Sequence, residues 1–549
     1  MRRWTRLTAT AIAVATLVIG VRYGSKVAGG SDSYGYVSQA DLFLSRQLSI
    51  SQPWVEAVPW PNLTWSFTPL AYRPGPGRWL VTPPVPHEAR DRWAIVPTTA
   101  PGLPLLMAGA KRIAGHCAIF WVVPICGALL VLATYGLGER MGSPVAGLIA
   151  AWLVATSPTT QRMVLEPMSD VPAAAAWAVA LRCLFGRSVS AGACAGLAAG
   201  LAITIRPNLV PLAIVPVCWQ IAAIVRARGA RGRAAWAAAA TLSGIAAGIV
   251  VIAAIQWAYY GSPWRSGYGA LDQLFDPANV GPNLRAYTSW FAGVHTPVAL
   301  AGVAALLVPA RRLWRGLVDR GMVVAGALFV AGLVTIYLPY SVFDSESYLR
   351  FLLPAWPFVM LGLAHVLLLP IGMVRWGSAV QRSIAIGVVA AAALILGLRG
   401  IQAAADDRRT LQEKEARYVT VATRLREISG DNAIVLAIQH SGSVRYYAGR
   451  MTLAFEALPP AWLDKAIAWM IERGMHPYAV LEDWEIRNLR SRYAGQASLA
   501  LFDTPIVQHA LVFVFDLKPD PSAPVRTEVI DAADVSCRPP APPPAVAWR

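Results

Sequence analysis

Residues 118–136 read AIFWVVPICGALLVLATYG, a run without any charged side chain. A helix of about 20 apolar residues is long enough to cross the hydrocarbon core of a bilayer. Comparable apolar runs occur at 7–21, 143–159, 171–186, 189–205, 208–225, 235–258, 297–310, 321–340, 351–370 and 380–398. The pattern therefore predicts a polytopic α-helical membrane protein with about eleven transmembrane helices.

The composition supports this fold class. The chain is 56% hydrophobic and 14% charged, whereas soluble proteins carry roughly 25% charged residues. Its net charge of +17 would suggest nucleic-acid binding in a soluble protein. Here, however, the arginines occur in short clusters between apolar runs, with no long basic run among them. We therefore expect membrane lipids as partners, and no nucleic acid.

The arginines of the short loops predict the orientation. With a cytoplasmic N-terminus, sixteen of them fall on the cytoplasmic side, and the short outer loops receive only Arg162, Arg206, Arg265, Arg285 and Arg350. The first apolar run lacks a good cleavage site, which favours an uncleaved helix over a signal peptide. We expect a multi-pass protein of the inner (plasma) membrane, with its C-terminal domain extracytoplasmic.

Two polar regions fall on the outer face. The first, 22–117, belongs to the expected transmembrane domain, 1–400, and contains a helix-compatible stretch at 33–47. The second, 401–538, is expected to be a soluble α/β domain, with strands at 433–437 and 510–515 and a helix at 463–473. A Pro-rich tail, 539–549, is expected to be disordered. The six cysteines show no CxxC spacing, so neither a metal site nor a disulfide framework is expected.

Several ionisable residues share the outer interface, where a charge needs a partner, water or a function. They are Asp32, Glu166, Asp170, Arg206, Asp344, Glu346 and Arg350. A carboxylate can serve as a general base for a hydroxyl nucleophile, and a guanidinium matches phosphate oxygens. Each residue also has a structural explanation: Asp32 can be solvated, Asp170 or Glu166 can cap a helix, Arg206 can extend to headgroups, and Arg350 can pair with a nearby carboxylate. Their convergence on one face favours a functional site.

The sequence around these residues resembles the GT-C superfamily of membrane glycosyltransferases. This superfamily includes protein O-mannosyltransferases, aminoarabinose transferases and bacterial family 39-like enzymes. The resemblance covers about 1–400 in topology and rests on the order of five motifs: GSDSYGY at 30–36, APGLPL at 100–105, MSDVP at 168–172, IRP at 205–207 and YLRFLLP at 348–354.

The resemblance implies an inverting glycosyltransferase that takes a sugar from a polyprenyl-phosphate-linked donor. The acceptor would be an envelope lipid, a polysaccharide or a protein. Asp32 would be the general base, and Asp170 or Glu166 would orient the acceptor or, with Asp32, hold a divalent cation. Arg206 and Arg350 would bind the departing phosphate. Ser33 stands where O-mannosyltransferases carry a second acid, which disfavours protein O-mannosylation.

Two other function classes fit a polytopic chain. A transporter or flippase often shows internal repeats and charged groups near the bilayer midplane. No repeat is evident here, and the ionisable groups gather at the outer interface instead. A non-catalytic assembly subunit is the third reading, which the gathered ionisable groups disfavour.

The C-terminal region resembles the tails of some bacterial relatives at 439–443, 445–449 and 481–485, with no activity attached. For His440, a structural polar role is favoured over contact with a glycan. Tyr446 and Tyr447 could stack on sugar rings or belong to the local core.

A reporter that is active only after export, fused after Gly430, tests the orientation. We expect activity there, because arginine-rich loops stay in the cytoplasm. The matched control is a fusion after Gly229, in an arginine-rich loop, which should be inactive. The reverse pattern would refute the orientation and the shared outer face.

Overall fold

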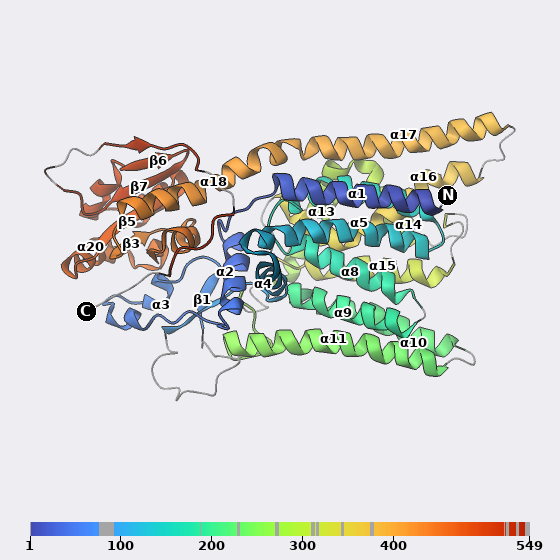
Figure 1. Cartoon of the computed structure of the whole chain (residues 1–549), viewed down its shortest axis with the longest axis horizontal. Coiled ribbons are helices and arrows are strands. Elements are labelled where there is room, and N and C mark those ends of the chain that lie inside the picture. The colour runs from blue at the N-terminus through green and yellow to red at the C-terminus, as the bar shows by residue number, and fades with distance from the viewer. Residues whose placement is uncertain are drawn as a thin grey trace. The chain divides into compact units, whose positions relative to one another are not determined.

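The computed structural model describes residues 2–75, 93–186, 188–227, 231–269, 274–308, 313–314, 318–341, 345–373, 378–520, 522, 526–533 and 537–543. Contacts divide the chain into two compact units, each assembled from three separate segments. The helical unit contains Met1–Gly24, Phe120–Ile252 and Gly269–Arg409. The mixed unit contains Ser25–Ile119, Ala253–Tyr268 and Thr410–Arg549. Figure 1 labels the elements of both.

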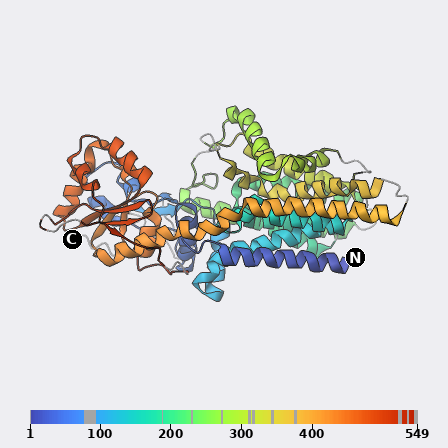
Figure 2. The same cartoon turned by 90° about the horizontal axis from the view of Figure 1, so that it is seen from above.

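The helical unit consists almost entirely of helices, and its long helices run roughly parallel to one another in both views (Figures 1 and 2). Its α-helices are α1 (Arg2–Tyr23), α5 (Val122–Arg140), α6 (Pro144–Thr156), α7 (Pro158–Met163), α8 (Asp170–Leu184), α9 (Val189–Ile205), α10 (Ile214–Arg226), α11 (Arg231–Tyr260), α13 (Val280–His295), α14 (Leu300–Leu307), α15 (Arg320–Tyr337), α16 (Trp356–Met373) and α17 (Ala379–Ala403). Tighter 3₁₀ turns occur at η4 (Pro207–Ala213), η5 (Pro277–Asn279), η6 (Pro297–Ala299) and η7 (Glu346–Ala355). The last residues of α11 belong to the mixed unit.

Among the described residues, seven helices are long and apolar enough to cross a membrane, or eight if a bent helix pair counts as one span. Helices α6 and α9 are apolar but shorter, with 13 and 17 residues. The mostly helical membrane fold is confirmed, whereas the count of about eleven spans stays a prediction.

The bent pair corrects the expected span at 297–310. Residues Pro277–His295 and Pro297–Leu307 meet at 115°, so the second part is only one arm of a broken helix. Thr296 stands at the break with a φ of 71°, and Pro297 follows it. A helix usually ends before a proline, because the residue that precedes proline is driven out of the α conformation. Apolar periodicity alone did not reveal this break.

Helices α9 and α11 pack backbone against backbone. Gly192, Gly196 and Gly200 recur at every fourth position of α9, and a Cβ on any of them would overlap the main chain of α11. Thr241 of α11 donates to the carbonyl of Gly192 at 3.0 Å. Small residues spaced by four let membrane helices approach closely and gain van der Waals contact. This stripe fixes the position of α9, which leads directly into Arg206.

In the mixed unit, the first loop (25–119) and the C-terminal segment (410–549) fold together. The first loop forms α2 (Asp32–Leu44), η1 (Pro53–Ala57), α3 (Leu63–Ser66), β1 (Tyr72–Pro74), β2 (Ile95–Pro97), α4 (Gly102–Ala114) and η3 (His116–Trp121). The C-terminal segment forms α18 (Ala405–Ile428), β3 (Ala433–Leu436), α19 (Ser441–Ser443), a π-turn η8 (Val444–Ala448), β4 (Met451–Leu453), η9 (Phe455–Ala457), η10 (Pro460–Trp462), α20 (Leu463–Glu472), β5 (His476–Glu482), α21 (Asp483–Arg492), η11 (Ala497–Phe502), β6 (Val507–His509), β7 (Val512–Asp516) and β8 (Glu528–Val529).

Strands of the C-terminal segment form one six-stranded sheet in the order β4-β3-β5-β7-β6-β8. Strand β3 is parallel to β4 and β5, while β7 pairs antiparallel with β5 and β6. The strands and the helix expected in this region lie at β3, β7 and α20. Helix α20 forms because Leu463, Ala466, Ile467 and Met470 recur at helical spacing and are all buried.

Both segments contribute to a single hydrophobic core. Trp60 and Phe67 of the first loop pack in one cluster with Leu453, Phe455 and Trp469 of the C-terminal segment. The buried Arg445 joins the segments through hydrogen bonds to the Gln52 side chain (3.2 Å) and the Phe67 carbonyl (2.6 Å).

The cysteines correct one expectation. Cys117, in η3, and Cys537, near the C-terminus, form a disulfide with a Cα–Cα distance of 5.1 Å. The two cysteines are 420 residues apart in the sequence, so a rule based on local cysteine spacing cannot predict this pairing. Of the expected Pro-rich tail, 539–543 are described, and the Ala541 amide donates to the Tyr446 carbonyl at 2.7 Å. Residues 544–549 lie outside the described part of the chain.

Replacing Gly196 with leucine should separate α9 from α11. We expect a loss of about 1–3 kcal/mol in unfolding free energy, because an overpacked interface must shift. Gly232→Leu is the matched control, since nothing lies within 4 Å of a Cβ there and leucine favours the helix. Thermal unfolding of both variants in the same detergent compares them. Equal stability of the two variants would contradict the packing argument.

Candidate functional site

The predicted site residues divide between the two units. Glu166, Asp170, Arg206 and Arg350 belong to the helical unit, and Asp32 belongs to the mixed unit. Asp344 lies outside the described residues. Each group is therefore described within its own unit.

Arg206 and Asp170 form a buried ion pair between two helix ends. Helix α9 ends at Ile205 because Pro207 disfavours a helical conformation at Arg206, whose φ and ψ are −137° and 88°. Helix α8 begins at Asp170, whose Oδ1 lies 2.6 Å from Arg206 Nη2. The side chain of Asp170 is 0% exposed and that of Arg206 is 11% exposed. Breaking a buried pair of this kind typically costs about 3–5 kcal/mol, because the remaining charge stays buried.

The contacts around Asp170 indicate its structural role. Ser169, not Asp170, occupies the N-cap of α8, and its hydroxyl accepts from Arg206 Nε at 3.1 Å. The helix N-terminus also favours the negative charge of Asp170. Helix capping by Asp170, the structural explanation considered above, is therefore replaced by a salt bridge. Oδ2 of Asp170 is buried and has no hydrogen-bond partner among the described residues.

Two guanidinium groups lie against one aromatic ring. Cζ of Arg206 is 5.1 Å from the centroid of Phe351, and Cζ of Arg350 is 5.5 Å from the same centroid. Arg350 also lies over Tyr348 at 5.6 Å and contacts the sulfur of Met168 at 3.4 Å. Aromatic faces attract cations through their quadrupole, so the ring helps to hold two like charges together. Such a pair of guanidiniums suits an anion with several oxygens.

Tyr337 completes this cluster. Its ring stacks on Phe351 with centroids 5.0 Å apart, and its hydroxyl accepts from Arg206 Nη1 (3.3 Å) and Asn208 Nδ2 (2.8 Å). Sequence reasoning missed Tyr337, because only the packing of α15 brings it to Arg206. Asn208 and Phe351 had a signal, since Asn208 follows the motif at 205–207 and Phe351 lies inside the motif at 348–354. Glu166 is half-buried in the connection from α7 to α8, and its carbonyl accepts from the Met168 amide at 2.8 Å.

In the mixed unit, Asp32 is the first residue of α2 and is half-buried. The loop that precedes it is buried at Val27, Ala28, Gly29 and Gly30. Gly30 has a φ of 56°, a left-handed conformation that glycine adopts without steric cost. The sequence at 29–32 therefore fits a tight turn that delivers Asp32 to the start of a helix.

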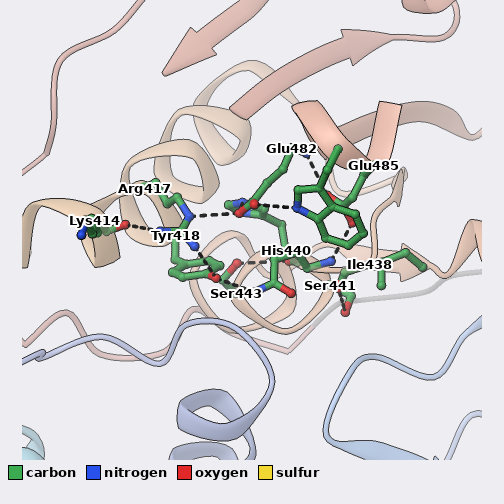
Figure 3. A network of polar contacts seen from close by, with 11 residues as sticks. Lys414, Arg417, Tyr418, Ile438, His440, Ser441, Ser443, Glu482 and Glu485 are labelled. Atoms are coloured by element: carbon green, nitrogen blue, oxygen red, sulfur yellow. Dashed lines mark hydrogen bonds and ion pairs between the residues drawn. The ribbon is translucent and has the colours of Figure 1, made fainter. Parts of the chain in front are cut away.

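Figure 3 shows a polar network in the C-terminal segment, and Tyr418 and Gln439 of this network adjoin that turn. Tyr418 Oη accepts from Arg417 Nη2 at 2.9 Å and from Gln439 Nε2 at 2.7 Å. Glu482 accepts from Arg417 Nε at 3.0 Å, and Glu485 accepts the amide of Gln439 at 2.9 Å. Glu482 and Glu485 form the capping box of α21, which explains their spacing of three.

Burial and neighbouring charges set the protonation of this network. Burial alone would raise the pKa of Glu482, but His440, Trp484 and Arg417 together lower it to about 2. Burial raises the pKa of Glu485 to about 7 despite its backbone hydrogen bonds. Burial also lowers the pKa of His440, whose side chain is 0% exposed and lies 3.3 Å from Glu482. The burial of His440 beside Glu482 therefore fits a structural role. Tyr446 and Tyr447 are also buried and belong to the local core.

A divalent cation was expected, if present, at Asp32 and Asp170. Among the described residues, no group of three or more His, Cys, Asp or Glu side chains could hold a metal ion. Asp170 already uses Oδ1 in its ion pair with Arg206. Asp32 and Asp170 belong to different units, so a cation bound by both stays a prediction, and no chemical step is assigned to one.

Comparison with known proteins places the fold. No protein-family model matches the sequence, and no curated protein matches it. The oligosaccharyltransferase of Archaeoglobus fulgidus in its apo form matches with a TM-score of 0.57 at 14% identity, over 91% of this chain and 73% of that one. The archaeal oligosaccharyltransferase AglB from the same organism, in complex with an inhibitory peptide and a dolichol-phosphate, gives 0.54 at 14% identity, over 87% and 69%.

A bacterial structure matches over nearly the full length of both chains. ArnT from Cupriavidus metallidurans, bound to undecaprenyl phosphate, gives a TM-score of 0.55 at 12% identity, over 95% of this chain and 99% of that one. At such low identities the likeness describes the fold. The chain shares the fold of these solved structures, which is the fold that the motif resemblance implied.

Proposed function

We propose that the protein is an inverting glycosyltransferase that moves a sugar from a polyprenyl-phosphate-linked donor to an extracytoplasmic acceptor. The observation that carries the proposal is the pair of guanidiniums, Arg206 and Arg350, against Phe351 at the ends of membrane helices. A lipid phosphate presents oxygens that a guanidinium fork can bind with two parallel hydrogen bonds. Two structures that share this fold contain dolichol-phosphate and undecaprenyl phosphate, which supports this donor class.

In the proposed reaction, Asp32 is the general base. It accepts the proton of an acceptor hydroxyl while that oxygen forms a bond to the anomeric carbon of the sugar. The bond from the anomeric carbon to the phosphate oxygen breaks, and the electron pair leaves on the polyprenyl phosphate. Attack from the opposite side inverts the anomeric configuration. The phosphate departs as an anion stabilised by arginine, so one carboxylate suffices, unlike the paired acids of glycoside hydrolases.

Asp170 is proposed as a positioning residue for Arg206. Its buried Oδ1 fixes one end of the guanidinium, and Tyr337 and Ser169 fix the others. An arginine held in one rotamer binds phosphate without losing further side-chain entropy. The role of Glu166 in orienting the acceptor stays a prediction.

The proposed location of the mixed unit is outside the cytoplasm of a bacterial cell, with the helical unit in the inner membrane. The Cys117–Cys537 disulfide supports this location, because disulfides persist in oxidising compartments. The arginine asymmetry of the loops supports it independently.

A transporter or flippase without transferase activity is the alternative, and one observation favours it. The broken pair α13 and α14 borders a cavity of about 160 Å³ lined by Ser157, His295, Thr296 and Arg399, among others. Transporters often build binding sites at broken helices. Turnover of a lipid-linked sugar by the purified protein decides between the two classes, since a transporter releases no glycosylated product.

Arg206→Lys should lose roughly 10- to 100-fold in transfer activity, because a point charge cannot replace bidentate contacts. Activity is measured in proteoliposomes with a polyprenyl-phosphate sugar. The matched control is Arg162→Lys, which changes another arginine of the helical unit that pairs with a carboxylate, Asp407 at 2.8 Å. Arg162→Lys should keep near-normal turnover. Full activity of Arg206→Lys would exclude the phosphate-fork role.

Asp32→Asn should lower turnover by about 10²–10⁴-fold, the usual contribution of a general base, while the protein stays folded and inserted. Asp41→Asn is the matched control on the same helix, because Asp41 pairs with Lys111 and Tyr446 inside the mixed unit. Mass spectrometry of envelope glycolipids and glycans from cells with each variant identifies the acceptor. If Asp32→Asn turns over normally, Asp32 is not the base, whatever Asp170→Asn does.

A further inference from the structure

We propose that Tyr418 and Gln439 are positioning residues for the turn that carries Asp32, which makes the C-terminal segment part of the catalytic apparatus. The inference rests on the proposed role of Asp32 as the base. It assigns a role to a region for which the motifs indicated none.

The turn lies directly on Tyr418. A Cβ added to Gly29 would overlap the ring of Tyr418, so only glycine allows the backbone to approach this closely. A Cβ on Gly30 would lie 3.3 Å from both Tyr418 Oη and Gln439 Nε2. Gly29 and Gly30, which precede Asp32, therefore pack directly against Tyr418 and Gln439 of the C-terminal segment.

Tyr418 is itself held from several sides (Figure 3). Its hydroxyl accepts from Arg417 and Gln439, and its ring packs against His440 with centroids 4.8 Å apart. Arg417 is in turn paired with Glu482 at 3.0 Å, and the amide of Gln439 is held by Glu485. The capping box of α21 thus fixes both partners of the Tyr418 hydroxyl.

The segments on either side of the turn are held by the same region. Before it, the Ala28 amide donates to the Tyr447 hydroxyl at 2.7 Å. After it, Gly442 packs so closely on the ring of Tyr34 that a Cβ would overlap it. The backbone at 27–30 is buried by these contacts, whereas 31–33 stay half-exposed. The C-terminal segment therefore fixes the backbone and leaves the carboxylate of Asp32 partly open.

This arrangement matters because a general base acts only within hydrogen-bond reach of the proton it removes. A displacement of about 1 Å at a reacting group can cost about 100-fold in rate. A turn without its own regular structure needs outside support to hold such a position.

Hydrogen exchange of the full-length protein in lipid nanodiscs tests, without any substrate, whether Tyr418 holds the turn that carries Asp32. Tyr418→Phe keeps the ring and deletes both hydrogen bonds to the hydroxyl. We expect the amides of 28–35 to exchange about 10-fold faster, the effect of roughly 1.4 kcal/mol of lost hydrogen bonding. The matched control is Tyr493→Phe, which deletes a buried hydroxyl that bonds the carbonyls of Phe455 and Leu458 in the same unit. It should leave these amides unchanged.

Kinetic measurements then test whether the contact of Tyr418 with the turn affects catalysis. We expect Tyr418→Phe to lower kcat about 10-fold with the KM for the polyprenyl-phosphate sugar unchanged, because the base is displaced and the donor site is intact. In an Asp32→Asn background, Tyr418→Phe should cause no further loss. Tyr493→Phe should keep wild-type kcat. Gln439→Leu removes the other side of the contact and serves if Tyr418→Phe is not recovered folded.

The outcomes separate this inference from the proposed function. Unchanged exchange, or faster exchange with unchanged kcat, would overturn the positioning role while the Asp32→Asn result still stands. Normal turnover of Asp32→Asn would instead remove the proposed base, whatever Tyr418→Phe does. A further loss from Tyr418→Phe in the Asp32→Asn background would show that the tyrosine acts on something other than Asp32.

Discussion

The mixed unit depends on one interaction: the first loop and the C-terminal segment share a hydrophobic core. Trp60 and Phe67 pack in one cluster with side chains of the C-terminal segment such as Leu453, Phe455 and Trp469. Burial of a large aromatic side chain contributes about 1.5–3 kcal/mol, so the shared core is a substantial part of the stability of this unit. The buried guanidinium of Arg445 donates hydrogen bonds to Gln52 and to the Phe67 carbonyl, and so fixes how the two segments pack together. The position of Asp32 follows from the same joint core.

In the helical unit, the corresponding constraint is the cost of a buried charge. Arg206 is tolerated because Asp170, Ser169 and Tyr337 satisfy its nitrogens and Phe351 covers its face. Ser169 and Asp170 come from the start of α8, Tyr337 from the end of α15 and Phe351 from η7, so the charge can be held only when these elements are correctly packed. The glycine stripe of α9 against α11 therefore matters to the site, since it fixes the helix that ends at Ile205.

Apolar periodicity predicted much of the fold. The runs at 118–136, 189–205 and 321–340 correspond to α5, α9 and α15, and the two expected strands correspond to β3 and β7. Charge and motif order pointed to Asp170 and Arg206, which the structure joins. The break at Thr296 was missed because apolar periodicity alone does not take account of Pro297, which is a local signal for a break. Tyr337, Tyr418 and Cys537 escaped because their partners are set by tertiary packing across long sequence separations, which no local pattern encodes.

The division of the mixed unit along the chain has a consequence for biosynthesis. Residues 25–119 are made first, but the sheet that completes their core lies at 410–549. At about 5–20 residues per second, the ribosome needs roughly 15–60 s to make the residues in between. During that interval Val55, Trp60 and Phe67 lack the partners that bury them. Until the C-terminal segment is made, the first loop thus resembles a folding intermediate with exposed apolar surface, and such an intermediate is a natural client for chaperones.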